Sequence, residues 1–159
     1  QAKESGQAAD SVTLKNVLGV WNLVHATSRK SPSVRWIMNQ DVEPDLELLT
    51  LGDKPLFIPG SDLAKSPNDQ LRGRAIESSV HSPALCDQGD LALIDFSQYL
   101  LVMGEDLRSD FSIHVKFLED KGVFRFIIHV GGRPWWSEPI TEPNSVTKRS
   151  FAAAIAERA

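Results

Sequence analysis

Two histidines in the second half of the chain, His114 and His129, are well suited to acid–base chemistry near neutral pH. They lie on opposite arms of a predicted β-hairpin, where they would be near neighbours. A hydrolase would also need an activated nucleophile, yet no serine lies in a G-x-S-x-G elbow. A metal site would need further ligands, yet the sequence has neither H-x-x-x-H nor C-x-x-C. We interpret the histidines as a cross-strand pair on a solvated face, with a histidine-based hydrolase as an alternative.

The acidic residues Asp87, Asp90 and Asp95 are close enough in sequence to invite comparison with calcium ligands. They lack the D-x-[DN]-x-[DN]-G pattern and its closing glutamate, so we expect them to be solvated loop residues. The single cysteine, Cys86, excludes an intrachain disulfide and has no paired base, so we expect no catalytic role for it. Neither a P-loop nor a G-x-G-x-x-G segment is present. The sequence thus predicts no catalytic residue, no metal and no cofactor.

Trp135 and Trp136 form an aromatic pair between two prolines, Pro134 and Pro139. Exposed indole rings can stack on a sugar or a base, which would make the chain a carbohydrate- or peptide-binding module. Arg133 is the one basic residue flanking the pair, and tryptophan is also enriched where a segment contacts a neighbouring subunit. We favour an anchoring or interface role and keep the non-enzymatic binding module as the alternative.

The composition argues against some classes of function. The 159 residues are 42% hydrophobic and 24% charged, which is ordinary for a soluble globular domain. The net charge of −4 argues against a protein that holds nucleic acid by neutralising phosphates, and no apolar run is long enough to span a membrane. The single cysteine fits a reducing compartment. Because the first residue is Gln1 and not methionine, we expect a processed product or a part of a longer protein.

The first half of the chain predicts helices. After a polar lead-in of residues 1–12, apolar residues recur at helical spacing and predict a helix over 13–28. A β-branched and aromatic run predicts a buried strand over 34–38, and a second helix is expected over 42–51. Residues 53–69 carry three prolines and a glycine across a polar stretch, which predicts a long loop.

The second half predicts strands. Runs of β-branched, aromatic or alternating residues indicate strands at 73–77, 90–95, 98–103, 111–118 and 123–130. The last two flank a hairpin turn at 119–122, and the alternation in the first arm predicts that one face is buried. Gly131-Gly132 predicts a further turn, and the alanine-rich tail at 151–156 fits either a helix or a docking strand. The fold class is therefore α+β, with two N-terminal helices packed on an antiparallel or mixed sheet.

Several different short segments, spread from residue 2 to residue 155, form an ordered series along the chain. The most distinctive are Val34–Pro44, in which an asparagine ends the predicted strand, and Gly89–Leu100. The other segments are Ala2–Ala9, Leu71–Ile76, Ser112–Phe117, Phe124–Phe126 and Gly132–Thr141. The ordered series resembles the major capsid protein family of tailed bacteriophages, which has the Hong Kong 97-type fold. Ala75, where that family often has proline, departs from the pattern.

The resemblance implies a structural, non-enzymatic subunit that assembles into the pentamers and hexamers of an icosahedral shell around DNA. It divides the chain into a lead-in at 1–12, an A-domain-like α+β region at 13–130 and a segment at 131–159 that returns toward the peripheral domain. Its partners would be copies of itself, scaffolding protein, portal and maturation protease, with no sequence-specific nucleic acid and no membrane. The protein would be located in the virion and, before assembly, in the bacterial host cytoplasm.

Two sets of contact residues are expected, the first implied by the resemblance and the second by the residue type. An axis-proximal loop is expected at Gly60, Ser61, Asp62, Lys65, Asn68 and Asp69. Trp135 and Trp136 would be interface or anchor residues. The family's N-terminal arm, extended loop and most of its long spine helix have no counterpart in this sequence, so this piece alone is not expected to assemble into shells.

Overall fold

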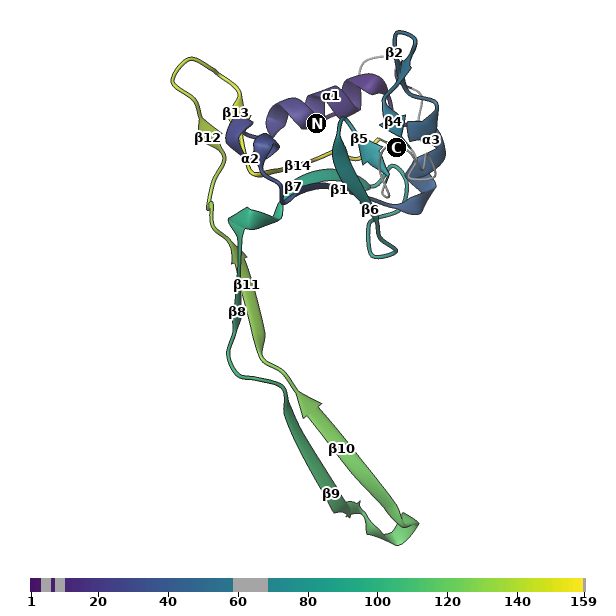
Figure 1. Cartoon of the computed structure of the whole chain (residues 1–159), viewed down its shortest axis with the longest axis vertical. Helices are drawn as coiled ribbons and strands as arrows, with labels where there is room; N and C mark the ends of the chain where they lie inside the picture. Colours follow the sequence, from purple (N-terminus) through teal and green to yellow (C-terminus); the bar gives the residue numbers. More distant parts are fainter. Residues whose placement is uncertain (4–6, 8–10, 59–68, 159) are drawn as a thin grey trace. The chain divides into compact units, whose positions relative to one another are not determined.

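The computed structural model describes residues 1–3, 7, 11–58 and 69–158. The chain forms two compact units (Figure 1). Unit 1 comprises Gln1–Gln98 and Trp136–Ala159, and unit 2 comprises Tyr99–Trp135. Unit 2 is therefore a single insertion, and both ends of the chain belong to unit 1.

Unit 1 begins with two short helices in place of the single helix predicted over 13–28. α1 (Leu14–Leu23) starts at Thr13, whose side chain forms a reciprocal capping box with Asn16. The helix ends because Val24 becomes extended and bridges Ser150, while the N–H of His25 donates to the Ser150 carbonyl at 2.8 Å. α2 (Ala26–Lys30) then starts with His25 as its N-cap. One continuous helix was the wrong prediction, because a backbone pairing with a distant segment interrupts it.

A mixed sheet of six strands forms the centre of unit 1, in the order β14-β7-β1-β6-β5-β4. Its strands are β1 (Val34–Met38), β4 (Phe57–Ile58), β5 (Gln70–Leu71), β6 (Arg74–Ser78), β7 (Leu91–Asp95) and β14 (Ala152–Ala154). β1 pairs parallel with β6 and antiparallel with β7, and β14 lies antiparallel along the other side of β7. The alanine-rich tail is thus a docking strand, and the predicted α+β class with a mixed sheet is confirmed.

The core of unit 1 lies between this sheet and the helices. Trp36, at the centre of β1, is fully buried and donates its indole N–H to the carbonyl of Leu71 at 3.0 Å. Leu93 on β7 lies opposite Trp36 in the ladder and is also fully buried. Other fully buried core residues are Val17, Val20, Val24, Met38, Val42, Leu46, Leu71, Leu91 and Ile155. Burial of each large apolar side chain contributes roughly 1.5–3 kcal/mol, so unit 1 has a substantial core of its own.

The helix predicted over 42–51 is shorter than expected. A 3-10 turn, η1 (Gln40–Val42), leads into α3 (Glu43–Glu47), and the chain then forms a small hairpin of β2 (Thr50–Leu51) and β3 (Lys54–Pro55). Leu46 faces the core, whereas Leu48 is 81% exposed, so the leucines of this segment do not share one buried helical face. The loop predicted over 53–69 likewise contains β3 and β4.

The chain re-enters unit 1 at Trp136 and runs through one further hairpin before it reaches β14. This hairpin pairs β12 (Ile140–Thr141) with β13 (Lys148–Arg149). A second 3-10 turn, η2 (Phe96–Gln98), carries the chain out of unit 1 after β7. The point of exit and the point of re-entry are tied together, because the indole N–H of Trp136 donates to Oε1 of Gln98 at 3.0 Å.

Unit 2 consists of two antiparallel ladders. β8 (Tyr99–Met103) pairs with β11 (Val130–Pro134), and β9 (Arg108–Lys116) pairs with β10 (Lys121–Ile127). A 3-10 turn, η3 (Phe117–Glu119), connects β9 to β10, which confirms the predicted hairpin. The turn predicted at Gly131-Gly132 is wrong, because both glycines pair with β8 inside the β8–β11 ladder.

Candidate functional site

The β9–β10 hairpin of unit 2 has one markedly apolar face. Phe111 lies opposite Phe124 in the ladder, with their ring centroids 4.7 Å apart, and Phe126 lies on the same face two residues along β10. These three side chains are 57%, 66% and 65% exposed. The prediction that this face is buried is therefore wrong for the single chain, because a two-stranded hairpin has no second layer to cover it.

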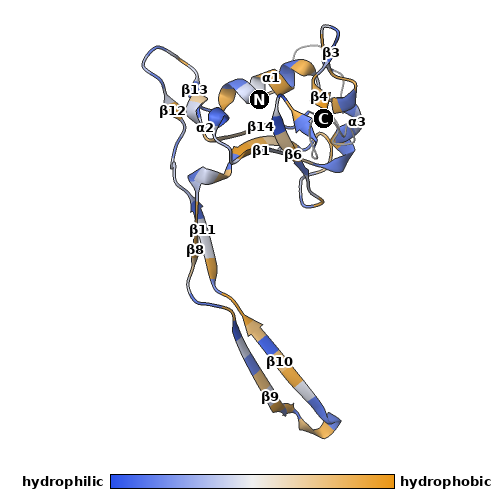
Figure 2. Cartoon of the chain, viewed as in Figure 1, coloured by the Kyte–Doolittle hydropathy of each residue, from blue (hydrophilic) through white to orange (hydrophobic). Residues whose placement is uncertain are grey.

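β8 of the β8–β11 ladder is apolar along most of its length (Figure 2), and its side chains are exposed on both faces. Tyr99, Leu101 and Met103 alternate along one side of β8 and Leu100 and Val102 along the other, and all five are between 43% and 61% exposed. Contiguous apolar patches larger than a few hundred Å² are rare on monomeric soluble proteins and mark interaction surfaces. Unit 2 therefore has an exposed apolar surface of the kind that is typical of interaction sites.

The opposite face of the β9–β10 hairpin is charged. Arg125 donates to Oδ2 of Asp110 at 2.7 Å, and Nε of Arg108 donates to Oδ1 at 3.2 Å. These hydrogen bonds, that of Arg125 first and that of Arg108 second, hold the pKa of the Asp110 carboxyl below its usual value. The hairpin thus has a wet face and an apolar face, and its asymmetry indicates which side meets a partner.

The two neighbouring tryptophans belong to different units. Trp135 is in unit 2 and is 71% exposed. Trp136 is in unit 1, where its ring makes edge contacts with His25 at 5.6 Å and with Phe151 at 6.1 Å between centroids. With its N–H bonded to Gln98, Trp136 links the segment that leaves unit 1 to the segment that re-enters it.

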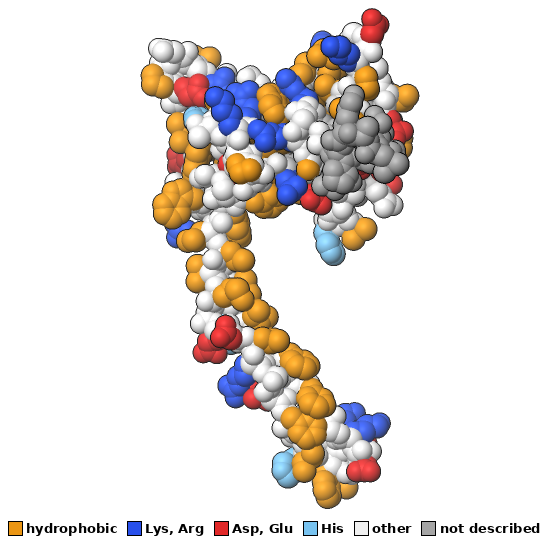
Figure 3. Space-filling view, in the orientation of Figure 1, with side chains coloured by type: hydrophobic (Ala, Val, Ile, Leu, Met, Phe, Trp, Pro, Cys, Tyr) orange, Lys and Arg blue, Asp and Glu red, His pale blue; other side chains and the backbone are white. Residues whose placement is uncertain are grey.

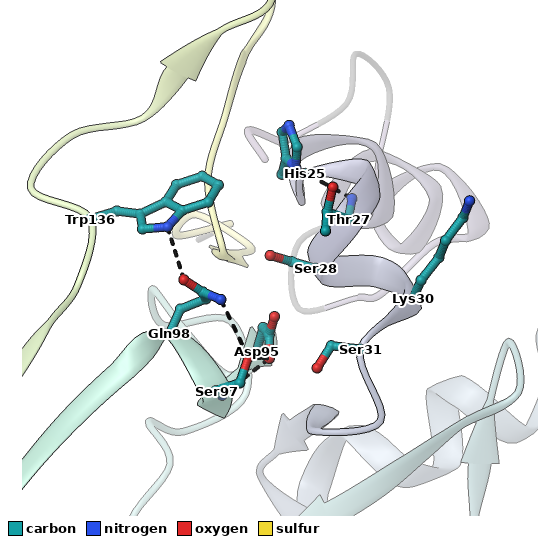
Figure 4. A pocket seen from close by; sticks show the side chains of 9 residues that line it. All are labelled: His25, Thr27, Ser28, Lys30, Ser31, Asp95, Ser97, Gln98 and Trp136. Carbon is teal, nitrogen blue, oxygen red and sulfur yellow. Dashed lines mark hydrogen bonds between the residues drawn. The ribbon is translucent and has the colours of Figure 1, made fainter.

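Trp136 also lines a pocket of about 490 Å³ in unit 1 (Figure 4). The lining combines side chains of the α2 region with side chains at the end of β7 and in η2. The lining residues are His25, Thr27, Ser28, Lys30, Ser31, Asp95, Ser97, Gln98 and Trp136. Most of them are polar, and three elements distant in sequence contribute, so the pocket lies at a junction of the fold.

His25, Asp95 and Ser97 of this pocket are engaged in structural contacts. Nδ1 of His25 accepts the N–H of Thr27 at 3.3 Å, and its Nε2 lies 3.7 Å from Oε1 of Glu142. Oδ1 of the buried Asp95 accepts the N–H and the hydroxyl of Ser97 at 3.1 and 2.7 Å. None of the serines that line the pocket is hydrogen-bonded to His25, so the geometry does not assemble a nucleophile with its base.

Comparison with known proteins decides the family. The sequence model described as the phage capsid family matches residues 1–143. The chain belongs to the phage capsid family. A search among curated proteins gave no match. Membership in a family of structural capsid proteins points to a non-enzymatic protein.

The capsid fold also emerges from a comparison of structures. The chain is similar to a solved chain described as the capsid of an empty GTA particle computed with C5 symmetry, with a TM-score of 0.64 and 17% sequence identity. The similarity covers 99% of this chain and 50% of the solved one. The chain thus spans about half the length of that structural relative.

Two acidic residues predicted to be solvated are buried in this capsid chain. Asp90 is fully buried and forms an ion pair with Arg158, which is itself fully buried. Arg158 donates from Nη1 to Oδ1 of Asp90 at 3.1 Å and from Nε to the carbonyl of Ser11 at 3.0 Å. The solvated-loop prediction is also wrong for Asp95, which lies at the base of the pocket with 1% exposure.

Cys86 belongs to the same buried cluster. Its backbone has a positive φ of 79°, its N–H donates to Oδ2 of Asp90 at 2.9 Å, and its carbonyl accepts the N–H of Arg158 at 3.0 Å. The cluster joins the segment that follows β14 to the loop before β7. Nothing in the sequence connects residue 90 with residue 158, so the sequence carried no signal for this ion pair.

The two histidines are not neighbours. In the β9–β10 ladder Lys121 lies opposite Lys116, whereas Ile127 lies opposite Arg108. His129 therefore lies beyond the far end of the ladder from His114, and its carbonyl accepts the N–H of Gly104 at 2.9 Å. The predicted cross-strand pair is wrong, because the hairpin register separates the residues.

Other site predictions fall partly outside the described residues. Gly60, Ser61, Asp62, Lys65 and Asn68 lie there, while Asp69 is described and its carbonyl accepts the N–H of Ile76 at 3.0 Å. Over the described ranges, no group of three His, Cys, Asp or Glu side chains could hold a metal ion. None of the helices among those residues is long and apolar enough to cross a membrane.

Proposed function

We propose that this chain is part of a capsid subunit that assembles with copies of itself into the pentamers and hexamers of an icosahedral shell around DNA. The family match over residues 1–143 carries the proposal. The exposed apolar strands of unit 2 support it, because large exposed apolar patches are rare on monomeric proteins and mark interaction surfaces. Rings of five or six copies form through heterologous contacts, in which different surfaces of the same chain meet.

The proposal extends to the parts of the chain. Residues 13–130 form the A-domain-like region, 131–159 return toward the peripheral domain, and the loop from Gly60 to Asp69 lies near the symmetry axes. Trp135 is an interface residue, whereas Trp136 anchors its segment to unit 1. The full protein works with scaffolding protein, portal and maturation protease. It resides in the virion and, before assembly, in the host cytoplasm.

Electron microscopy of two proteins tests the proposal. The full-length protein that carries this chain should form regular closed shells under assembly conditions. The chain alone should remain small, because it spans about half of its structural relative and lacks the remaining contacts. Full-length protein that stays dispersed at every concentration and salt would contradict the function.

A carbohydrate- or peptide-binding module is the second candidate, favoured by one observation. Trp135 is 71% exposed and lines a pocket of about 310 Å³ with Leu100, Arg133 and Pro134. A glycan array and a peptide library, each probed with the native chain and with Trp135→Ala, test this reading. Binding that depends on Trp135 supports the module, and equal signals from both proteins remove it.

A further inference from the structure

Two arginines of unit 1 make cation–π contacts with the same tryptophan, Trp21. The guanidinium carbon of Arg72 lies 4.7 Å from the ring centroid of Trp21, and that of Arg29 lies 5.9 Å from it. Burial and, to a smaller extent, the charge of Arg29 lower the pKa of Arg72. The Trp21 ring in turn stacks on the core residue Trp36, with centroids 6.4 Å apart. The two cations are therefore held near each other on a platform anchored in the core.

The arginine pair has no counter-charge within the described residues. Neither Arg29 nor Arg72 forms an ion pair with any described carboxylate, and Nε of Arg29 is buried without a hydrogen-bond partner. The chain as a whole has 21 acidic and 17 basic residues, so partners of opposite charge are plentiful. Two like charges about 4 Å apart repel by about 1 kcal/mol in water, and an anion placed between two cations removes such a cost.

The local backbone fixes the pair in position. Arg72 lies in the tight β5–β6 turn, where it and Gly73 have φ values of 54° and 71°. Arg74, the next residue along, donates to the carbonyls of Arg29 and Ser31 and so ties this turn to the end of α2. A pre-positioned pair of planar guanidinium groups suits a carboxylate, because each group can donate two parallel hydrogen bonds.

A surface of complementary charge lies on another part of unit 1. On η1 and α3, Asp41 and Glu47 are exposed and Glu43 is half-buried. The carboxylate of Asp45, in contrast, accepts a hydrogen bond from the N–H of Val12 at 2.8 Å. Asp41, Glu43 and Glu47 form no ion pair with any side chain in the described part of the chain. α2 and α3 lie at opposite ends of α1 (Figure 1), and Lys and Arg side chains gather over the α1–α2 side (Figure 3).

We propose that Arg29 and Arg72 of one copy bind the carboxylates of Glu43 and Glu47 on the next copy. The contact joins different surfaces of identical chains, as a ring of copies requires. The inference rests on the proposed function and adds to it the residues of one interface. A nucleic-acid phosphate is the other anion to consider, but proteins that bind nucleic acid through phosphates carry a broad basic stripe, whereas this chain has a net charge of −4.

Charge variants of the full-length protein test the contact. R29Q/R72E and E43K/E47K should each lower the yield of shells about tenfold or more, measured by sedimentation and electron microscopy. The matched controls K54Q/K148E and D53K/E138K make the same changes of net charge at other exposed residues of unit 1 and should assemble normally. The combined variant R29Q/R72E/E43K/E47K should recover assembly, because opposite charges again face each other, and recovery also shows that the substituted chains fold.

Cysteine pairing provides a second measurement. Shells made from a mixture of R72C and E43C subunits and treated with a bismaleimide, which alkylates two thiols and spans more than the roughly 7 Å between Cα atoms that a disulfide allows, should yield a covalent dimer that contains one subunit of each kind. Shells of either variant alone should not. The native Cys86 does not interfere, because it is 4% exposed.

The possible failures are distinguishable. Native protein that forms no shells contradicts the proposed function itself. Native shells together with normal assembly of R29Q/R72E, or with no recovery in the combined variant and no mixed crosslink, overturn the interface alone. Normal shells of R29Q/R72E that have lost DNA would assign the arginine pair to phosphate binding and would also overturn the interface.

Discussion

Units 1 and 2 use similar strands in different surroundings. β1 of unit 1 reads Val-Arg-Trp-Ile-Met and buries alternate residues completely, whereas β8 of unit 2 reads Tyr-Leu-Leu-Val-Met and exposes every residue. The difference lies in the second layer, because helices cover the sheet of unit 1 and nothing within unit 2 covers its ladders. Apolar strands without a second layer indicate that unit 2 completes its packing only in contact with other protein. Unit 1 should therefore behave as a self-sufficient domain and unit 2 as an assembly surface.

The largest expected change in the free energy of unfolding comes from removing the buried ion pair of unit 1. Arg158→Ala leaves the carboxylate of Asp90 buried without its partner and should destabilise the chain by about 3–5 kcal/mol. Chemical denaturation followed by tryptophan fluorescence measures the loss. Arg35→Ala is the control, because it removes an exposed pair with Glu77 at 3.6 Å and should cost at most about 1 kcal/mol. Equal losses in both variants would show that unit 1 does not depend on its buried cluster.

A pair of truncations on strands compares the two units directly. Leu93→Ala opens a cavity in the fully buried core of unit 1 and should cost about 2–5 kcal/mol. Val115→Ala shortens a side chain of β9 that is 70% exposed and should change the free energy of unfolding by at most about 0.5 kcal/mol. Denaturant titrations of the isolated chain measure both. A large loss from Val115→Ala would mean that the hairpin is already packed in the single chain.

Local patterns in the sequence predicted elements but not the contacts that decide their limits. Alternation and turn residues predicted the β9–β10 hairpin, and the order of short motifs predicted the capsid fold. The break at Val24 and the replacement of a helix by β2 arise from pairings with other segments, which a local pattern does not contain.

The same limit applied to the functional residues. Trp136 was predicted as an anchor or interface residue from its type, and it contacts Gln98, His25 and Phe151 within unit 1, while its role stays a prediction. Arg29, Arg72 and Trp21 are distant in sequence, and only the folded β5–β6 turn brings them together. The Arg158–Asp90 pair was missed for the same reason.

Deletion of unit 2 tests whether unit 1 folds without it. The β8–β11 ladder pairs Tyr99 with Pro134, and Gln98 is bonded to Trp136, so a few Gly and Ser residues can replace Tyr99–Trp135 without moving unit 1. The remaining chain keeps its whole core and should retain its free energy of unfolding within about 2 kcal/mol, the scale of a change in loop-closure entropy. Analytical ultracentrifugation should also show less self-association than in the parent chain. An unfolded deletion variant would refute the independence of unit 1.

The smallest expected effect concerns the charged face of the unit 2 hairpin. Hydrogen bonds from Arg125 and Arg108 lower the pKa of Asp110 below the ordinary value of about 3.9, so Arg125→Gln should raise it toward that value. A lowered carboxyl pKa stabilises the hairpin fully above the ordinary pKa, and the stabilisation disappears as the pH falls through the lowered value. Carboxyl chemical shifts in an NMR titration measure both pKa values, and Lys121→Gln, which removes a pair with Glu119 instead, is the control. If Arg125→Gln left the Asp110 pKa unchanged, the charged face would not be ordered in solution, and the hairpin would lose the asymmetry that separates its wet side from its apolar side.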